Sequence, residues 1–404
     1  MGDGNCMTYE WHRRAVESIH HGALTNSKRP ECLVFGAYPT HVERGEGCFI
    51  YDTSGKKLID YICGLGTNLV GYSNKSVNRA MSEQMLKGTL FSLSSKTEVM
   101  AAEKLKNHIT FISKVRFFKT GTEACMAAVR IACAHTGRSK ILSEGYHGWA
   151  DSFVSLMPPH LGVENLSHIE KLTSLSSITK ETACVIVEPI MTDLSDNRIT
   201  YLQNLKARCK EVGALLIFDE IITGFRFPKL TFSQFSGIHP DIICLGKAIA
   251  NGMPLAVVGT KQGIGDGKEW FCSGSYCGET LSLVAMMDVI DLLNNKFSLD
   301  ELWLHGGSFM SRFNELWPEK IKLEGYPTRG VFVGDDMTKA LFWQECIKAN
   351  ILFGPSWFYN FRHIDYNDLI LGSLKDIILK IKNGNARLEG QLPVKPFAQT
   401  MREK

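Results

Sequence analysis

The sequence predicts an α/β protein with one large, mostly parallel sheet and a second, smaller α+β domain. Between residues 115 and 297, short apolar runs rich in β-branched residues alternate with helical patterns, as they do in parallel sheets with crossover helices. Before and after this range the pattern changes to a hairpin and to mixed strands and helices. At 404 residues the chain exceeds the usual size of a single core, so we expect two domains.

The N-terminal segment, residues 1–75, is expected to supply an arm and a hairpin to the smaller domain. A helix is expected around Tyr9–Ile19, and Gly47–Ile62 shows two alternating runs on either side of a Thr-Ser-Gly turn. Helical patterns at Asn74–Lys87 and Lys96–His108 lead into the larger domain, for which we expect residues 76–297.

The larger domain shows six strand patterns with helices between them. The strands are expected at Val115–Phe118, Lys140–Ser143, Ala183–Pro189, Ala214–Asp219, Asp241–Leu245 and Pro254–Gly259. The helices are expected at Thr122–His135, Ser167–Leu172, Thr200–Val212 and Glu279–Asn294. Residues 298–404 should complete the smaller domain, with strands at Lys320–Glu324 and Gly330–Gly334 and helices at Thr338–Ala349 and Asn367–Asn383.

The composition is that of an ordinary globular protein, with 44% hydrophobic and 22% charged residues. The formal net charge of +3 comes from acidic and basic residues mixed along the chain, without a basic run. We therefore expect neither a nucleic-acid partner nor a membrane partner. The 12 cysteines are scattered, many lie in apolar runs, and none forms a CxxC pair, which favours reduced thiols in the cytoplasm.

Charged residues stand at the ends of three expected strands. Asp219 and Glu188 each end an apolar run, and Lys247 follows another. Because ligands bind at the carboxyl ends of strands in an open α/β sheet, we expect these side chains to line one crevice. Asp219 and Lys247 could instead form a structural ion pair, and the residue types alone do not decide between the two interpretations.

Two further segments follow strands of the same sheet. Gly121 and Thr122 begin a helix, where unpaired backbone N–H groups and the helix dipole favour an anion such as a phosphate. The alternative is that Thr122 merely caps its own helix.

In Tyr146-His147-Gly148, the aromatic ring of Tyr146 could stack on a planar ligand, or it could simply fill the core. No second ligand stands at helical or hairpin spacing from His147, so we expect no metal site.

Pyridoxal phosphate accounts for these features together. It has a phosphate, a flat ring, an aldehyde that forms a Schiff base with lysine, and a pyridine nitrogen that an acidic residue keeps protonated. A nucleotide would require a glycine-rich loop, and the chain contains neither GxxxxGK[ST] nor GxGxxG.

In these motifs the chain resembles fold-type I pyridoxal-phosphate enzymes of the class-III aminotransferase family, in the branch similar to glutamate-1-semialdehyde aminomutase. The resemblance runs from about Lys28 to Phe397 and is carried by several motifs together. They are Gly-Thr-Glu-Ala at 121–124, Tyr-His-Gly at 146–148, Asp-Glu-Ile at 219–221 with Thr-Gly-Phe-Arg at 223–226, and the segment from Pro240 to Pro254 that contains Leu-Gly-Lys at 245–247. It implies the fold-type I architecture, with a mostly parallel, mixed, seven-stranded sheet in the large domain.

The resemblance also implies a role for each residue that matches a motif. Lys247 matches the Schiff-base lysine and Asp219 the acid at the pyridine nitrogen. Ile221 and Tyr146 match the residues on the two faces of the ring, with His147 beside them. The remaining cofactor residues are the phosphate-binding Gly121 and Thr122, the strand-end Glu188, and Gly274 and Ser275, which match the pair that a neighbouring subunit contributes. A homodimer with shared active sites follows.

Departures from the family pattern affect the substrate side. Gly36-Ala37-Tyr38-Pro39 stands where the aminomutase has a segment with a carboxylate-binding arginine, and only Trp149 to Ser167 separates Tyr-His-Gly from the next helix. Both features favour a more open site. Lys119 and Thr120 also stand where Asn and Ser are usual, and both substitutions suit a phosphate site.

We therefore expect an aminotransferase that moves an amino group from an amino-acid donor to an aldehyde or keto acceptor through a Schiff base at Lys247. Lys247 would also move the proton at the substrate α-carbon. An aminomutase or an epimerase would use the same cofactor residues. A protein that kept the fold for binding alone is a third alternative, which the presence of both Lys247 and Asp219 disfavours.

Overall fold

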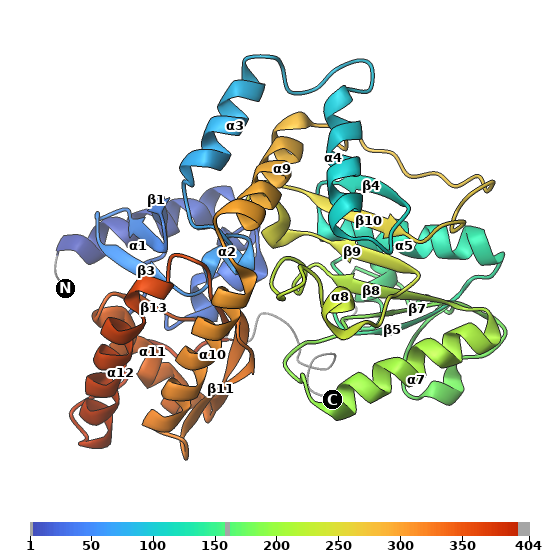
Figure 1. Cartoon of the computed structure of the whole chain (residues 1–404). Coiled ribbons are helices and arrows are strands. Elements are labelled where there is room, and N and C mark those ends of the chain that lie inside the picture. The colour runs from blue at the N-terminus through green and yellow to red at the C-terminus, as the bar shows by residue number, and fades with distance from the viewer. Residues whose placement is uncertain (1–2, 158–161, 395–404) are drawn as a thin grey trace. The chain divides into compact units, whose positions relative to one another are not determined.

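The computed structural model describes residues 3–157 and 162–394, and the chain divides into two compact units. The larger unit contains Lys75–Asp300, and the smaller unit contains the described residues before and after that range. Figure 1 labels their helices and strands.

A mixed sheet of seven strands forms the centre of the larger unit, in the order β4-β10-β9-β8-β7-β5-β6. Strand β10 runs antiparallel to both of its neighbours, and all other pairs are parallel. The mostly parallel, seven-stranded sheet that we expected is thus confirmed. The strands are β4 (Lys114–Phe118), β5 (Lys140–Glu144), β6 (Ile169–Lys171), β7 (Thr182–Val187), β8 (Leu215–Glu220), β9 (Ile242–Leu245) and β10 (Ala256–Thr260).

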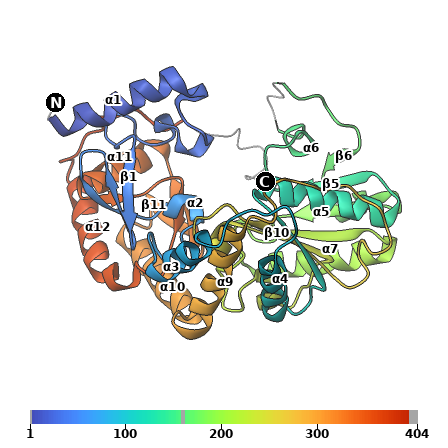
Figure 2. The same cartoon turned by 90° about the horizontal axis from the view of Figure 1, so that it is seen from above.

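Helices cover both faces of this sheet. Along the strand order, the connection from β4 to β5 moves towards β6, whereas the connection from β7 to β8 moves towards β4. Because both crossovers are right-handed, α5 and α7 lie on opposite faces of the sheet. Figure 2 shows this arrangement. The helices of the unit are α3 (Lys75–Met85), α4 (Lys96–His108), α5 (Gly121–Thr136), α6 (Asp151–Val154), α7 (Asp196–Val212), α8 (Phe232–Ser236) and α9 (Thr280–Asn295).

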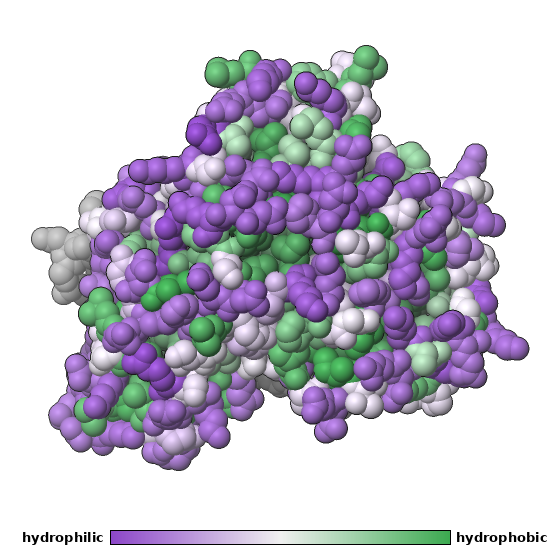
Figure 3. All heavy atoms as spheres, viewed as in Figure 1, coloured by the Kyte–Doolittle hydropathy of each residue, from purple (hydrophilic) through white to green (hydrophobic). Residues whose placement is uncertain are grey.

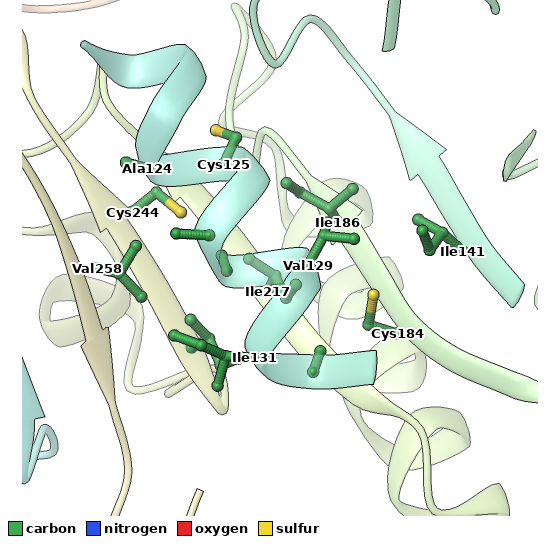
Figure 4. Packing of buried hydrophobic residues seen from close by; sticks show 14 of the residues in the cluster. Ala124, Cys125, Val129, Ile131, Ile141, Cys184, Ile186, Ile217, Cys244 and Val258 are labelled. Atoms are coloured by element: carbon green, nitrogen blue, oxygen red, sulfur yellow. The ribbon is translucent and has the colours of Figure 1, made fainter. Parts of the chain in front are cut away.

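Helix α5 packs its apolar side against β7, β8, β9 and β10. Small residues such as Ala124 and Ala128 let the helix approach the sheet, and Val129 and Ile131 fill the space further along. Figure 4 shows this core, in which Cys125 of α5 and Cys244 of β9 are among the buried side chains. The packing fixes the first turn of α5 relative to the ends of the strands.

One predicted element of the larger unit is wrong. The segment Ser167–Leu172, expected to be helical, contains the edge strand β6, which pairs only with β5 in the sheet. Ile169 is buried opposite Ile141 while Glu170 and Lys171 are exposed. Charged residues protect an edge strand from further pairing, and here they imitate the polar face of a helix.

The smaller unit joins the two ends of the chain through one sheet, in the order β1-β2-β3-β13. Strand β13 near the C-terminus runs parallel to β3 of the predicted hairpin, and β11, β12 and β14 form a separate sheet. The strands are β1 (Val42–Glu46), β2 (Phe49–Asp52), β3 (Lys57–Asp60), β11 (Ile321–Tyr326), β12 (Arg329–Gly334), β13 (Ile351–Leu352) and β14 (Ser356–Phe358).

Helices complete the smaller unit, and two of them were not expected from the sequence. They are α1 (Asp3–Ser18), the single turn α2 (Cys63–Gly66), α10 (Leu299–Leu316, which begins at the unit boundary), α11 (Asp336–Lys348) and α12 (Asn367–Lys382). The unexpected helices are the single turn α2 and the long helix α10. No helix in the described part of the chain is long and apolar enough to span a membrane.

Candidate active site

The first turn of α5 follows β4 directly and is capped by Thr120. The Thr120 hydroxyl accepts a hydrogen bond from the Glu123 amide at 3.2 Å, and the Glu123 carboxylate accepts one from the Thr120 amide at 2.8 Å. This is a capping box. The alternative in which Thr122 caps its own helix is therefore wrong. The amides of Gly121 and Thr122 precede the first intrahelical bonds and remain suited to an anion.

The side chain of Ile221 connects this turn to the segment that carries Lys247. A Cβ atom on Gly121 would lie 2.6 Å from Ile221 Cδ1, and one on Gly246 would lie 3.3 Å from Ile221 Cγ2. Both glycines are thus needed for the backbone to come so close to the isoleucine. The contacts bring Gly121, Ile221 and the residue before Lys247 into one cluster.

The turn after β5 lies against the same helix start. Gly148 has a φ of 104°, and a Cβ atom there would lie 2.2 Å from the Thr122 hydroxyl. Two residues earlier, the Tyr146 amide donates a hydrogen bond to Glu188 Oε1 at 2.8 Å. Glu188, just beyond β7, is buried, so this bond fixes the Tyr-His-Gly turn at the strand ends.

Asp219 of β8 is 5% exposed and accepts hydrogen bonds from three donors. The Ile221 amide donates to Oδ1 at 3.1 Å, while His147 Nδ1 and the Cys125 thiol donate to Oδ2 at 2.8 and 3.3 Å. The carboxylate can only accept, so the proton of the shortest of these bonds lies on His147 Nδ1. These donors compensate the buried carboxylate for the hydrogen bonds with water that it has lost.

His147 is held in a charged pair with Asp219. Burial lowers the pKa of its ring, but the hydrogen bond and negative charge of Asp219, with a contribution from Cys125, outweigh burial and raise the pKa to about 10. Its Nε2 is buried and has no hydrogen-bond partner within the described residues. The ring also packs edge-on against Phe153 at a centroid distance of 5.3 Å.

Cys125, His147 and Asp219 are also the donor types that bind zinc, and their ligand atoms lie within 4.8 Å of one another. The sequence offered no spacing that would reveal this set, because the three residues come from three separate elements. The 2.8 Å contact between His147 and Asp219 is a direct hydrogen bond. We therefore interpret the set as a hydrogen-bonded group that supports Asp219.

Lys247 begins a short turn immediately after β9. Asp219 pairs in register with Cys244 and Glu220 with Leu245, so Lys247 lies two residues beyond the paired part of β9. Lys247 has a φ of 46°, a left-handed conformation that a residue with a side chain rarely adopts. Such strain often marks a functional position. The side chain itself is partly buried.

Gly274 and Ser275 are not brought together with the other predicted site residues. Both are exposed in the loop between β10 and α9. An ion pair links the end of that loop to the residue that follows β4, because Lys119 Nζ lies 2.9 Å from Glu279 Oε2. Glu279 in turn caps α9.

The arrangement fits pyridoxal phosphate in three respects. Open amides at the α5 start suit the phosphate, a buried carboxylate suits the pyridine nitrogen, and a lysine stands on an adjacent strand end. Of the shortened segment between Trp149 and Ser167, residues 158–161 lie outside the described part of the chain.

Comparison with known proteins gives matches to one family. The family described as aminotransferase class-III matches residues 36–168 and 155–351. The glutamate-1-semialdehyde 2,1-aminomutase of Saccharolobus islandicus strain M.14.25 is 35% identical over 286 residues, which cover 64% of this chain and 67% of the relative. That of Desulfotalea psychrophila is 32% identical over 311 residues, 69% and 71% of the two chains.

Solved structures match over nearly the whole chain. The FumI protein of Sphingopyxis sp. MTA144 gives a TM-score of 0.86 at 22% identity and covers 96% of this chain and 98% of its own. A glutamate-1-semialdehyde aminomutase of Pseudomonas aeruginosa PAO1 gives 0.80 at 17% identity, covering 93% and 95%. At these identities the similarity shows the shared fold.

Proposed function

The chain belongs to the class-III aminotransferase family, and from this premise we propose a pyridoxal-phosphate-dependent aminotransferase that moves an amino group from an amino-acid donor to an aldehyde or keto acceptor. The main support is the set of contacts at the strand ends. Ile221 touches the positions of Gly121 and Gly246, and Asp219 is held two residues before it in β8. The start of α5, the Asp219 carboxylate and the residue before Lys247 therefore lie close together at the carboxyl ends of the strands, which supports this function.

When bound, pyridoxal phosphate supplies an aldehyde that condenses with amines and a pyridinium ring that stabilises negative charge on the neighbouring carbon. The amides of Gly121 and Thr122 would bind its phosphate, and the Lys247 amine would hold its aldehyde covalently. Asp219 would keep the ring nitrogen protonated, since an adjacent negative charge favours the protonated form.

Each of the other site residues would then have a defined task. Ile221 and Tyr146 would hold the ring from its two faces, and Glu188 would fix the Tyr146 backbone. His147 would hold the Asp219 carboxylate in place. As a free amine, Lys247 Nζ would accept the α-proton of the substrate and return it one position away.

A glutamate-1-semialdehyde aminomutase is the second candidate, because the curated relatives carry that name. The structure of the smaller unit favours a transferase. Tyr38, within the segment that stands in place of the arginine-bearing one, is buried, and its hydroxyl donates to the Phe353 carbonyl at 2.9 Å. That hydroxyl is therefore not free to replace an arginine as the group that binds a substrate carboxylate.

We also propose that two copies of the chain form a dimer with shared active sites. Gly274 and Ser275 are exposed, and large apolar side chains are exposed in the same loop, Phe271 by 78%, and in the connection from α3 to α4, Leu93 by 84%. Figure 3 shows apolar residues over this connection at the top of the view. The first residue of α9, which follows the loop directly, is linked to the connection by a 2.9 Å hydrogen bond from the Thr280 amide to the Thr89 carbonyl.

An apolar surface of this kind favours a protein partner, and a second copy would bring Gly274 and Ser275 to the other active site. A cytoplasmic location is proposed as well, because the cysteines whose side chains are described are free thiols.

A half-reaction separates transferase from mutase and epimerase. The loaded protein is mixed with single amino acids in the absence of any acceptor, and a transferase should release one keto acid per active site. If no keto acid is released and glutamate 1-semialdehyde is converted to its isomer, the protein is a mutase instead.

The Lys247→Ala protein tests the assignment of the lysine. Borohydride reduction followed by mass spectrometry should show cofactor attached to the wild-type peptide that contains Lys247 and no attachment in the variant. The control is Lys268→Ala, which removes an exposed lysine from the same unit. Unchanged attachment in Lys247→Ala would contradict the assignment.

A further inference from the structure

Asp219 has one unusual hydrogen-bond donor, the thiol of Cys125. The sulfur lies 3.3 Å from Oδ2, the same oxygen that accepts from His147 Nδ1. Cys125 has no exposed surface and Asp219 is 5% exposed, so water does not compete for this bond. A thiol is a weak donor, but inside a protein a bond to a charged acceptor gains strength.

The position of Cys125 follows from the packing of α5. The cysteine lies in the second turn of the helix, on the side that faces β8 and β9, next to the buried Ala124 and Ala128. On the adjacent strand, the buried Cys244 is paired in register with Asp219. Figure 4 shows the two cysteines on their separate elements. The Cys125 thiol and the His147 imidazole thus bond to the same oxygen of the carboxylate, and Cys244 is its neighbour on β9.

Cys125 can donate a hydrogen bond because its thiol stays protonated. Burial raises the pKa of the Cys125 thiol well above its ordinary value, with the neighbouring Cys244 and the charge of Asp219 adding to the effect, so the sulfur keeps its proton. A carboxylate has about four acceptor positions. Three are used, by Ile221, His147 and Cys125. The carboxylate keeps one position for a further donor.

We propose that Cys125 is a positioning residue for the cofactor, whose thiol fixes the orientation of Asp219 so that the remaining acceptor position is presented to the pyridine nitrogen. This inference rests on the proposed function. The Cys125 thiol is then the third donor that holds the Asp219 carboxylate, beside the Ile221 amide and His147 Nδ1. Without the thiol, the carboxylate rotates more freely and offers its charge to the ring less often.

The test compares Cys125→Ala, Cys125→Ser and Cys184→Ala with the wild type. Cys184 is the matched control, because it is a fully buried thiol of the same core on β7 and has no hydrogen bond to Asp219 within the described residues. Cofactor-free proteins are titrated with pyridoxal phosphate, and the dissociation constant is measured by fluorescence quenching.

Cys125→Ala should bind about five- to tenfold more weakly, which corresponds to about 1 to 1.4 kcal/mol at 1.4 kcal/mol per tenfold change. Cys125→Ser, which keeps a donor, should restore most of the affinity, and Cys184→Ala should bind like the wild type. Equal affinity of Cys125→Ala and wild type, or equal losses in Cys125→Ala and Cys184→Ala, would overturn the proposal.

A second readout needs no cofactor. The S–H stretching band of Cys125 is isolated as the infrared difference between the cofactor-free wild type and Cys125→Ala, and hydrogen bonding to a carboxylate should move it below the band of Cys184 obtained in the same way. An unshifted band would show that the thiol does not donate. If the wild type itself binds no pyridoxal phosphate while the band is shifted, the proposed function fails and the hydrogen bond stands.

Discussion

Replacing His147 by Asn should change how the stability of the protein depends on pH. The side-chain amide that His147→Asn introduces can donate to Asp219 from about the place of Nδ1, but it does not titrate. In the wild type, Asp219 and Cys125 outweigh the effect of burial and raise the pKa of His147 from 6.5 to about 10. A pKa raised in the folded state means that the folded protein holds the proton more tightly than the unfolded chain.

The sign and size of the effect follow from this shift. The stabilisation by His147 is fully present below pH 6.5, the ordinary pKa, and is lost as the pH rises to about 10. At 1.36 kcal/mol per pH unit, the loss amounts to at most roughly 5 kcal/mol. Native domains have a total stability of about 5–15 kcal/mol, so the change is large enough to measure.

The assay is urea unfolding of the cofactor-free wild type and His147→Asn at a series of pH values from 6 to 10. Titrations common to both proteins cancel in the difference between their free energies of unfolding. That difference should be most favourable to the wild type near pH 6 and should decline steadily up to pH 10. A difference that stays flat would show that folding does not raise the pKa of His147 and would refute the reasoning.

His239→Asn serves as the control for that experiment. Burial lowers the pKa of His239 below its ordinary value, and Lys206 and Lys261 lower it further, so folding does not hold a proton on this ring at alkaline pH. The difference between wild type and His239→Asn should therefore be flat between pH 7 and 10.

Two other substitutions follow from close contacts and exposed surface. Gly148→Ala should destabilise the protein by about 2–4 kcal/mol, since its Cβ would meet the Thr122 hydroxyl at 2.2 Å from a backbone with a φ of 104°. Gly137→Ala, at a φ of 67° with open space around it, should cost only about 1 kcal/mol, and equal losses in urea unfolding would contradict the packing argument. Leu93→Asp should raise the dissociation constant of the dimer, measured by sedimentation, about tenfold or more, which corresponds to about 1.4 kcal/mol or more. The control Leu304→Asp, at an exposed leucine of the other unit, should leave the dissociation constant unchanged. A monomeric wild type would contradict the proposed dimer.

The alternation of apolar strands and helices was enough to predict the larger unit, because strands buried on both faces leave a strong local pattern. Each of the six predicted strands begins and ends within two residues of an observed one, and the largest overrun at a C-terminal end is that of Ala183–Pro189 beyond β7. The family resemblance is confirmed by the match over residues 36–351. Its residue assignments at the site remain a proposal that the substitutions above test.

Helix α10 escaped prediction for a physical reason that only the fold reveals. Gly306 and Gly307 stand in its middle, and paired glycines argue against a helix. A Cβ atom on Gly306 would lie 1.9 Å from the Pro327 carbonyl oxygen. The glycine is there because the turn between β11 and β12 packs directly on the helix backbone, a tertiary contact that overrides local propensity.

The cap of α5 could have been found from the sequence, whereas the partners of Asp219 could not. Thr120 and Glu123 form the Thr-x-x-Glu pattern of a capping box, which assigns the cap to Thr120 and leaves Thr122 available for a ligand. No comparable pattern connects Cys125 or His147 with Asp219, because the first lies 94 positions away and the second 72.

The contrast between these two cases shows where this site's chemistry is determined. A helix cap is local, so its residues stand at a fixed spacing. The environment of Asp219 is set instead by which strands are neighbours: β8 lies beside β9, which places Cys244 opposite the carboxylate, and α5 covers both strands, which places Cys125 over it. The same sheet order puts Lys247 one strand away from Asp219. If Asp219 meets the cofactor as we propose, the charge that it presents depends on the buried thiol of Cys125 as well as on His147, and substitutions in the core beneath the site should alter cofactor binding without touching the cofactor.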